Sequence, residues 1–271
     1  MTDDKQQTMS RRDMVKLAGL SALAGTVGVM LATPHSAAGA GHLQARALFF
    51  DVGGTILDWS VMPEKMEAYL AERGVTVDGR EFWPAWRTKM FLYMMYNTMI
   101  GSGFVPLEEL ARRSTLALAQ SMRLDLTSED ARGLYPLLGE LDVYPDVAPG
   151  LEALRKQGYM LVPHTQLSEP VLRRALLVRF DWDWYFTSET FAMYKPNRAI
   201  YLNALDAMGL DVSEVVYVSS NQFDVFAAKG VGFRTAWVDR WGEELEPYGY
   251  TPDWHVNDFV ELAVTLDAES Q

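Results

Sequence analysis

Four short apolar runs constrain the fold of this 271-residue chain more than any other feature. They cover residues 47–50 (Ala-Leu-Phe-Phe), 160–162 (Met-Leu-Val), 215–218 (Val-Val-Tyr-Val) and 235–238 (Thr-Ala-Trp-Val). Unbroken rather than alternating apolarity is typical of parallel strands that are covered on both faces. The runs therefore predict a buried parallel sheet.

Helical patterns separate the later runs and cover residues 148–157, 196–208 and 222–229. Pro196 suits the first position of the second helix, and Gly230 suits the end of the third. Alternation of strands and helices predicts an α/β fold with a doubly wound, Rossmann-like parallel sheet.

The stretch between the first two runs is too long for one crossover helix. It has helical patterns over residues 63–73, 81–99, 106–123 and 127–138, and one face of the third carries Leu107, Leu110, Ala111, Leu118 and Met122. We therefore expect an α/β core domain of residues 44–58 and 141–265, with an all-helical cap subdomain of residues 59–140 inserted in it. Such a cap would cover the carboxyl ends of the strands, where ligands bind in open α/β sheets.

Residues 1–40 are expected to be an export signal peptide. Arg11, Arg12 and Lys16 precede an apolar run of 17 residues at 17–33, and small residues follow it. The paired arginines resemble the twin-arginine signal, so the expected partner is the twin-arginine export machinery and the expected location is periplasmic or secreted. An uncleaved membrane anchor is the alternative, although the run is short for a span of about 20 residues.

Charge and composition exclude several classes of function. A formal net charge of −12 argues against a nucleic-acid partner and against docking on an anionic membrane. The absence of cysteine excludes disulfides, thiolate metal ligands and a cysteine nucleophile.

Polar residues follow the first and third apolar runs. Asp51 ends the first run and is followed by Gly53, Gly54 and Thr55, whereas the third leads into Ser219-Ser220-Asn221 and Asp224. These residues would meet at one edge of the sheet, and the loop carrying Lys195 is expected there too. Turn formation and helix capping are alternative explanations for some of them. Asp224 falls in a first helical turn, where the helix dipole favours its ionised form.

In chain order, these segments resemble the haloacid dehalogenase superfamily. Further motifs are similar to the type II L-2-haloacid dehalogenases, and the resemblance covers about residues 45–265. The motifs are Trp86-Arg87-Thr88-Lys89, Tyr194-Lys195-Pro196 followed by Tyr201, and Thr251-Pro252-Asp253-Trp254.

The resemblance implies hydrolysis of small 2-haloalkanoic acids to 2-hydroxy acids, with no cofactor. No metal is expected, because Gly53 stands where a second Asp usually contributes to a magnesium site. Asp51 would displace the halide and form an ester, which Asp224 and Asn221 would hydrolyse with water. Lys195 would pair with Asp51, while Thr55 and Ser219 would hold it by hydrogen bonds. Arg87 would stabilise the departing halide, and Tyr201, Thr165 and Gln166 would orient the site and bind the substrate carboxylate. Family members are often dimers, so a homodimer is one option for assembly.

Gly53 distinguishes this chain from the phosphatases of the superfamily and also from the type II dehalogenases. Most members of the superfamily are phosphatases, which have a second Asp at this position that protonates the leaving alkoxide. Glycine has no side chain to donate a proton, but a halide leaves without being protonated. A metal-dependent phosphatase-type hydrolase and a non-catalytic periplasmic binding protein remain alternatives.

The type II dehalogenases have a pocket-lining Tyr at Gly53 and Ser-Asn at Thr165-Gln166, so a reshaped pocket is expected. His164 would either add a base or cation at the pocket rim or be a packed histidine. The aromatic residues of the second cap helix are expected in the cap core: Phe82, Trp83, Phe91, Tyr93 and Tyr96.

Overall fold

The computed structural model describes residues 44–101 and 103–270, which belong to one compact unit. The expected signal peptide lies outside the described residues and stays a prediction. Within the described residues, none of the helices has the length and apolar character that a membrane span requires.

A five-stranded parallel sheet in the order β2-β1-β3-β4-β5 forms the centre of the fold. Its strands are β1 (Ala47–Phe50), β2 (Met160–Pro163), β3 (Val215–Ser219), β4 (Arg234–Val238) and β5 (Trp254–Val256). All four apolar runs are strands, as predicted. The edge strand β5 was missed because it has only three residues, the middle one of which is exposed.

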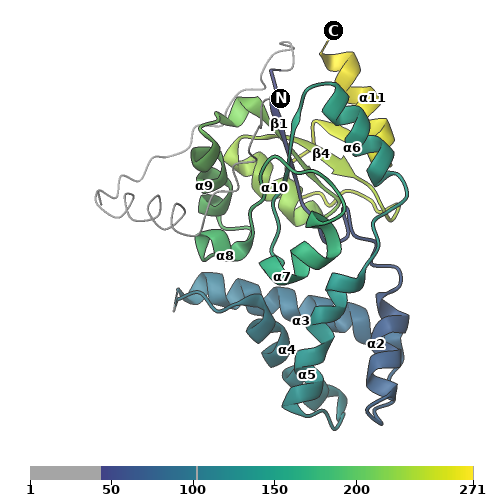
Figure 1. Cartoon of the computed structure of the whole chain (residues 1–271). Helices are drawn as coiled ribbons and strands as arrows, with labels where there is room; N and C mark the ends of the chain where they lie inside the picture. Colours follow the sequence, from purple (N-terminus) through teal and green to yellow (C-terminus); the bar gives the residue numbers. More distant parts are fainter. Residues whose placement is uncertain (1–43, 102, 271) are drawn as a thin grey trace, which may run out of the picture. The chain divides into compact units, whose positions relative to one another are not determined.

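Helices cover both faces of the sheet, which confirms the doubly wound α/β prediction (Figure 1). Leu48 and Phe50 pack on one face, with α6 (Val147–Lys156) and α11 (Phe259–Glu269). Ala47 and Phe49 pack on the other, with α9 (Arg198–Met208) and α10 (Gln222–Val231).

Four further helices lie between β1 and β2 and gather at one end of the sheet (Figure 1). They are α2 (Met62–Ala71), α3 (Gly79–Ile100), α4 (Leu107–Met122) and α5 (Ser128–Leu134), and each packs against the next. The fourth predicted cap helix is shorter than expected, because a 3-10 helix, η1 (Tyr135–Glu140), follows at once. Met122 is exposed, so the buried face of α4 ends before it. The exact core and cap boundaries stay a prediction.

Two predicted helix ends were wrong. Pro196 is not the first helical residue, because the Asn197 side chain accepts a hydrogen bond from the Ala199 N–H and α9 begins at Arg198. Gly230 does not end α10, which continues to Val231 and is capped by Gly232 at φ 119°. Helix α11 was not predicted, and neither were four short elements. These are α7 (Glu169–Leu172), the π-helix Arg173–Leu177, α8 (Ser188–Phe191) and the 3-10 helix Val212–Glu214.

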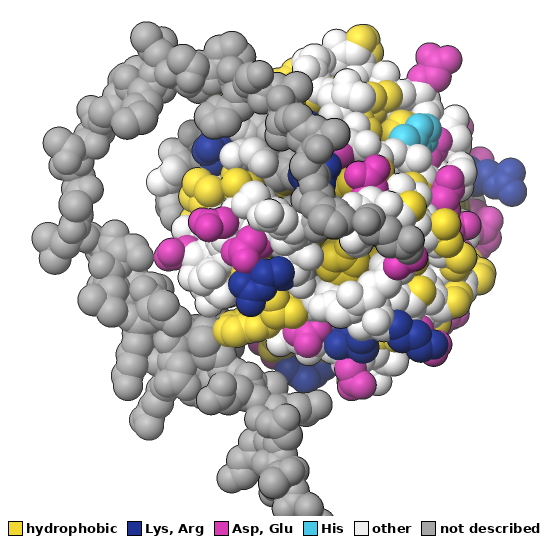
Figure 2. Space-filling model, turned by 90° about the horizontal axis from the view of Figure 1, so that it is seen from above, with side chains coloured by type: hydrophobic (Ala, Val, Ile, Leu, Met, Phe, Trp, Pro, Cys, Tyr) yellow, Lys and Arg dark blue, Asp and Glu magenta, His cyan; other side chains and the backbone are white. Residues whose placement is uncertain are grey.

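Acidic and basic side chains are interspersed on the face seen in Figure 2, which agrees with the salt bridges between exposed residues. In the part of the chain that the structure describes, no three His, Cys, Asp or Glu side chains group in a way that could hold a metal ion.

Candidate active site

The strand order brings the predicted polar segments to one place. β1 lies between β2 and β3, and a sheet of order 2-1-3-4-5 binds its ligand at the β1/β3 switch point. Asp51 follows β1, Thr165 follows β2, and Asn221 follows β3. Residues as much as 170 positions apart in sequence are therefore hydrogen-bonded here.

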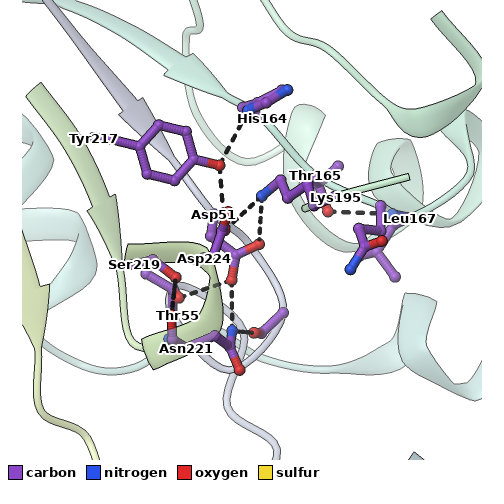
Figure 3. A network of polar contacts seen from close by, with 12 residues as sticks. Asp51, Thr55, His164, Thr165, Leu167, Lys195, Tyr217, Ser219, Asn221 and Asp224 are labelled. Atoms are coloured by element: carbon purple, nitrogen blue, oxygen red, sulfur yellow. Dashed lines mark hydrogen bonds and ion pairs between the residues drawn. The ribbon is translucent and has the colours of Figure 1, made fainter. Parts of the chain in front are cut away.

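Asp51 is held by three donors from different segments (Figure 3). Lys195 Nζ lies 3.0 Å from its Oδ1, while Asn221 Nδ2 and Thr55 Oγ1 donate to its Oδ2 at 2.7 and 3.0 Å. Only 7% of Asp51 is exposed. The carboxylate is therefore fixed in one orientation.

Lys195 is fully buried and joins two carboxylates. Its ammonium lies 3.0 Å from Asp51 and 2.8 Å from Asp224, and Asp224 is also fully buried. Burial acts to lower the pKa of Lys195, but the two carboxylates outweigh it and the pKa is raised. With both carboxylates ionised, the three groups carry a net charge of −1 in a dry environment, where charge is costly.

Asp224 lies in the first turn of α10, where the helix dipole favours its ionised form, but burial acts against that form. Burial raises the pKa of this carboxyl from 3.8 to about 6, and the charge of Asp51 acts in the same direction. Lys195 and the Tyr201 hydroxyl oppose the shift. Desolvation therefore outweighs the favourable position in the first turn of α10.

Two tyrosines hydrogen-bond the Asp224 carboxylate, and a histidine contacts the hydroxyl of one of these tyrosines. Tyr201 and Tyr217 both donate hydrogen bonds to its carboxylate, and His164 Nδ1 lies 3.0 Å from the Tyr217 hydroxyl. Since that hydroxyl donates its proton to Asp224, His164 donates to its oxygen. Of the two options expected for His164, the structure shows a packed histidine and not a residue at the pocket rim. It is fully buried, and burial holds its pKa well below 6.5.

Ser219 does not hydrogen-bond Asp51, contrary to the prediction. Its hydroxyl accepts a hydrogen bond from the Asn221 N–H at 3.0 Å and so fixes the backbone of that loop. Thr55 acts as predicted, since it donates to Asp51 while accepting from the Ser220 N–H at 2.9 Å. Asn221 stands at the N-cap of α10, but its side chain bonds Asp51 and the Gly53 carbonyl instead of capping.

A cavity of about 320 Å³ opens beside Asp51. Of the predicted site residues, Asp51, Arg87, Thr165, Gln166 and Asn221 line it. The apolar part of the lining consists of Trp59, Trp83, Met90, Phe91, Met94, Leu107, Leu138, Leu167 and Phe223.

Tyr201 was placed wrongly among the substrate-binding residues, because it is fully buried, does not line the cavity and contacts Asp224. Lys195 and Asp224 also lie behind the cavity wall. Trp83 and Phe91, expected only in the cap core, line the cavity as well.

Arg87 reaches from α3 into the cavity. Its Nη2 donates to Asn221 Oδ1 at 3.1 Å, and its guanidinium carbon lies 4.4 Å from the centre of the Trp59 ring. Burial lowers its pKa. A guanidinium is still charged at neutral pH because its ordinary pKa is so high. Hydrogen bonds thus link Arg87 to Asn221, and Asn221 to Asp51, along the cavity wall.

Trp59 explains why residue 53 is glycine. A Cβ atom added to Gly53 would lie 2.6 Å from the Trp59 indole, which is closer than non-bonded carbon atoms approach. The indole therefore occupies the space next to position 53. Trp59 escaped the sequence analysis because nothing in its neighbourhood in the chain indicates this contact.

Comparison with known proteins agrees with this geometry. The family model described as haloacid dehalogenase-like hydrolase matches residues 45–232. The chain belongs to this family. Among curated haloacid dehalogenase-like relatives, the (S)-2-haloacid dehalogenase 4A of Burkholderia cepacia is 30% identical over 227 residues, covering 80% of this chain and 93% of the relative.

Other members of the haloacid dehalogenase-like family are similar over the same length. The (S)-2-haloacid dehalogenase of Pseudomonas sp. (strain YL) is 28% identical over 234 residues, covering 83% of this chain and 97% of the relative. A solved L-2-haloacid dehalogenase is 28% identical with a TM-score of 0.70, covering 83% of this chain and 99% of that one.

Proposed function

We propose that this protein is a 2-haloacid dehalogenase that hydrolyses 2-haloalkanoic acids to 2-hydroxy acids. One observation carries the proposal: the Asp51 carboxylate, held by Lys195, Thr55 and Asn221, lies in the wall of a cavity whose cation is Arg87. The curated relatives named above are 2-haloacid dehalogenases, which supports the same reaction.

In the first step, a carboxylate oxygen of Asp51 attacks C2 of the substrate. A carbon–oxygen ester bond forms, and the carbon–halogen bond breaks with its electron pair leaving on the halide. No proton is transferred. Arg87 and Asn221 line the cavity beside Asp51, where they stabilise the negative charge that develops on the halogen.

In the second step, water attacks the carbonyl carbon of the Asp51 ester. The oxygen of water stays in the Asp51 carboxylate, the 2-hydroxy acid leaves with the alkoxide oxygen protonated, and one proton is released overall. While Asp51 is esterified, Lys195 keeps only Asp224 as an anionic partner. We assign the base in this step to Asp224: because it is fully buried, Lys195 Nζ, which contacts both carboxylates, passes a proton to Asp224 and takes one from the water at the Asp51 ester.

The space around Gly53 favours dehalogenation over phosphoryl transfer. A phosphatase of this superfamily needs a carboxylic acid at this position to protonate the leaving alkoxide. Trp59 fills the space that its side chain would enter. The alternative phosphatase reaction therefore has no acid at this position.

Halide release tests the proposed reaction. With 2-bromopropionate, we expect bromide release that is unchanged by EDTA, because the proposed chemistry uses only side chains. Magnesium-dependent phosphate release from p-nitrophenyl phosphate, without bromide release, would instead identify the protein as a phosphatase. Binding of the haloacid without either reaction would support the binding-protein alternative.

The pH dependence of kcat, which includes hydrolysis of the ester, tests the role of Asp224. Burial raises its pKa, to about 6 before the ester forms, so kcat should fall at acidic pH as the base becomes protonated. Tyr201→Phe removes a hydrogen bond that lowers this pKa, so the acid limb should move to higher pH. Tyr69→Phe in the cap is the control and should leave it in place. An acid limb that Tyr201→Phe does not move would contradict this role.

A further inference from the structure

The cavity is larger than a three-carbon haloacid requires. Its volume of about 320 Å³ reaches the range of about 300–1,000 Å³ that is typical of pockets enclosing drug-sized ligands. The reacting carbon and the substrate carboxylate must lie near Asp51 and Arg87. Much of the remaining volume is therefore free for a substituent on C2.

Part of the cavity lining runs along helix α3. Arg87, Met90 and Met94 are spaced three and four residues apart and line one face of this helix. At 1.5 Å per residue, Met94 lies about 10 Å further along the helix axis than Arg87. The cavity lining thus extends along α3 from the charged Arg87 to apolar side chains.

Four side chains define this extension, which we call the apolar arm: Met90, Met94, Leu107 and Leu138. They come from α3, α4 and η1, and each is at most 8% exposed. Among the described residues that line the cavity, only Asp51 and Arg87 carry a charge. An alkyl chain would lose its contact with water in the arm without desolvating an ionised group.

We propose that the enzyme selects 2-haloalkanoic acids whose C2 substituent is an unbranched alkyl chain longer than methyl, such as the butyl group of 2-bromohexanoate. The chain lies in the apolar arm while the carboxylate and halogen stay at the charged end. Flexible methionines fit such a chain because they adapt to irregular apolar shapes. This inference rests on the proposed dehalogenase function and adds its substrate class.

The test compares 2-bromohexanoate with 2-bromopropionate. Each buried methylene favours binding by roughly fourfold, so the three additional methylenes should raise kcat/KM at least tenfold. Met94→Trp fills the arm and should lower the ratio of the two kcat/KM values at least tenfold. Met94→Phe is a milder variant in case the first one folds poorly. Met99→Trp, on the same helix but 80% exposed, is the matched control and should keep the ratio.

Binding of the unreactive acids hexanoate and propionate, measured by calorimetry, separates this inference from the proposed function. If bromide is released but 2-bromohexanoate is not preferred, or both Met94 variants keep the preference, the substrate class is wrong and the function stands. If no bromide is released, yet hexanoate binds more tightly and Met94→Trp removes the difference, the function fails and the ligand class is supported. Equal binding of both acids to an inactive protein would overturn both.

Discussion

Asp51→Asn should lower kcat for bromide release from 2-bromopropionate by about 10⁴-fold or more, as expected when a nucleophile is removed. The substitution keeps the size of the side chain but replaces the attacking carboxylate with an amide, which does not form the ester. Substrate binding should persist, because Arg87 and the rest of the cavity lining are unchanged. Bromide release under saturating substrate is the measurement.

The matched control is Asp142→Asn, which removes a carboxylate whose side chain is 90% exposed and paired with Arg179. It should leave kcat unchanged within about twofold, as expected for a surface pair. Asp51→Ala is a second variant to be measured, because alanine does not revert to Asp, whereas the new Asn does so by slow deamidation. If both Asp51 variants fold and keep more than a tenth of the activity, Asp51 is not the nucleophile.

Lys195→Met should give the largest loss of stability, about 3–5 kcal/mol of the free energy of unfolding at pH 7.5. It removes the cation between two buried carboxylates that lie 2.8 and 3.0 Å from its Nζ. Their charges are left uncompensated, and halide release should fall as well. Urea unfolding measures the stability, and the surface variant Lys156→Met should cost less than about 1 kcal/mol because its pair with Glu152 is exposed.

The loss from Lys195→Met should depend on pH. Lys195 lowers the pKa of Asp224, so its removal raises a pKa that is already about 6. A carboxyl whose pKa is raised by folding costs stability above its folded pKa, and this cost disappears as the pH falls below the unfolded value. Below about pH 6 this carboxyl is protonated in both folded proteins, so the part of the deficit that Asp224 causes should shrink as the pH falls from the variant's raised pKa towards 6.

Adding Asp224→Asn to Lys195→Met should recover part of the stability, because one of the two uncompensated charges is removed. Two results would contradict the charge balance described here. One is a Lys195→Met loss no larger than that of Lys156→Met, and the other is a double variant less stable than Lys195→Met alone.

Some of the site could be predicted because its signals are local in the sequence. The apolar run before Asp51 identifies a buried strand, and the change to Gly-Gly-Thr shows where that strand ends. The same reasoning places Asn221 after β3. Parallel strands then bring these ends together, so the sequence pattern and the sheet rule suffice for the centre of the site.

The rest depends on packing that leaves no local pattern. Tyr217 belongs to an apolar strand run, yet its hydroxyl joins His164 to Asp224. Tyr201 sits on a helix with ordinary periodicity and faces Asp224 rather than the cavity. Trp59 fills the space beside Gly53 only because the hydrogen-bonded turn at residues 52–57 brings it back there.

The covalent step at Asp51 is the central claim, and mass spectrometry after turnover in ¹⁸O-enriched water tests it most directly. Each ester hydrolysis places one oxygen from water in the Asp51 carboxylate, so after several turnovers the peptide containing Asp51 should carry ¹⁸O. The product of a single turnover, with enzyme in excess, should carry the unlabelled oxygen of Asp51. An unlabelled peptide together with ¹⁸O in the first-turnover product would show that water attacks C2 directly and would contradict the mechanism.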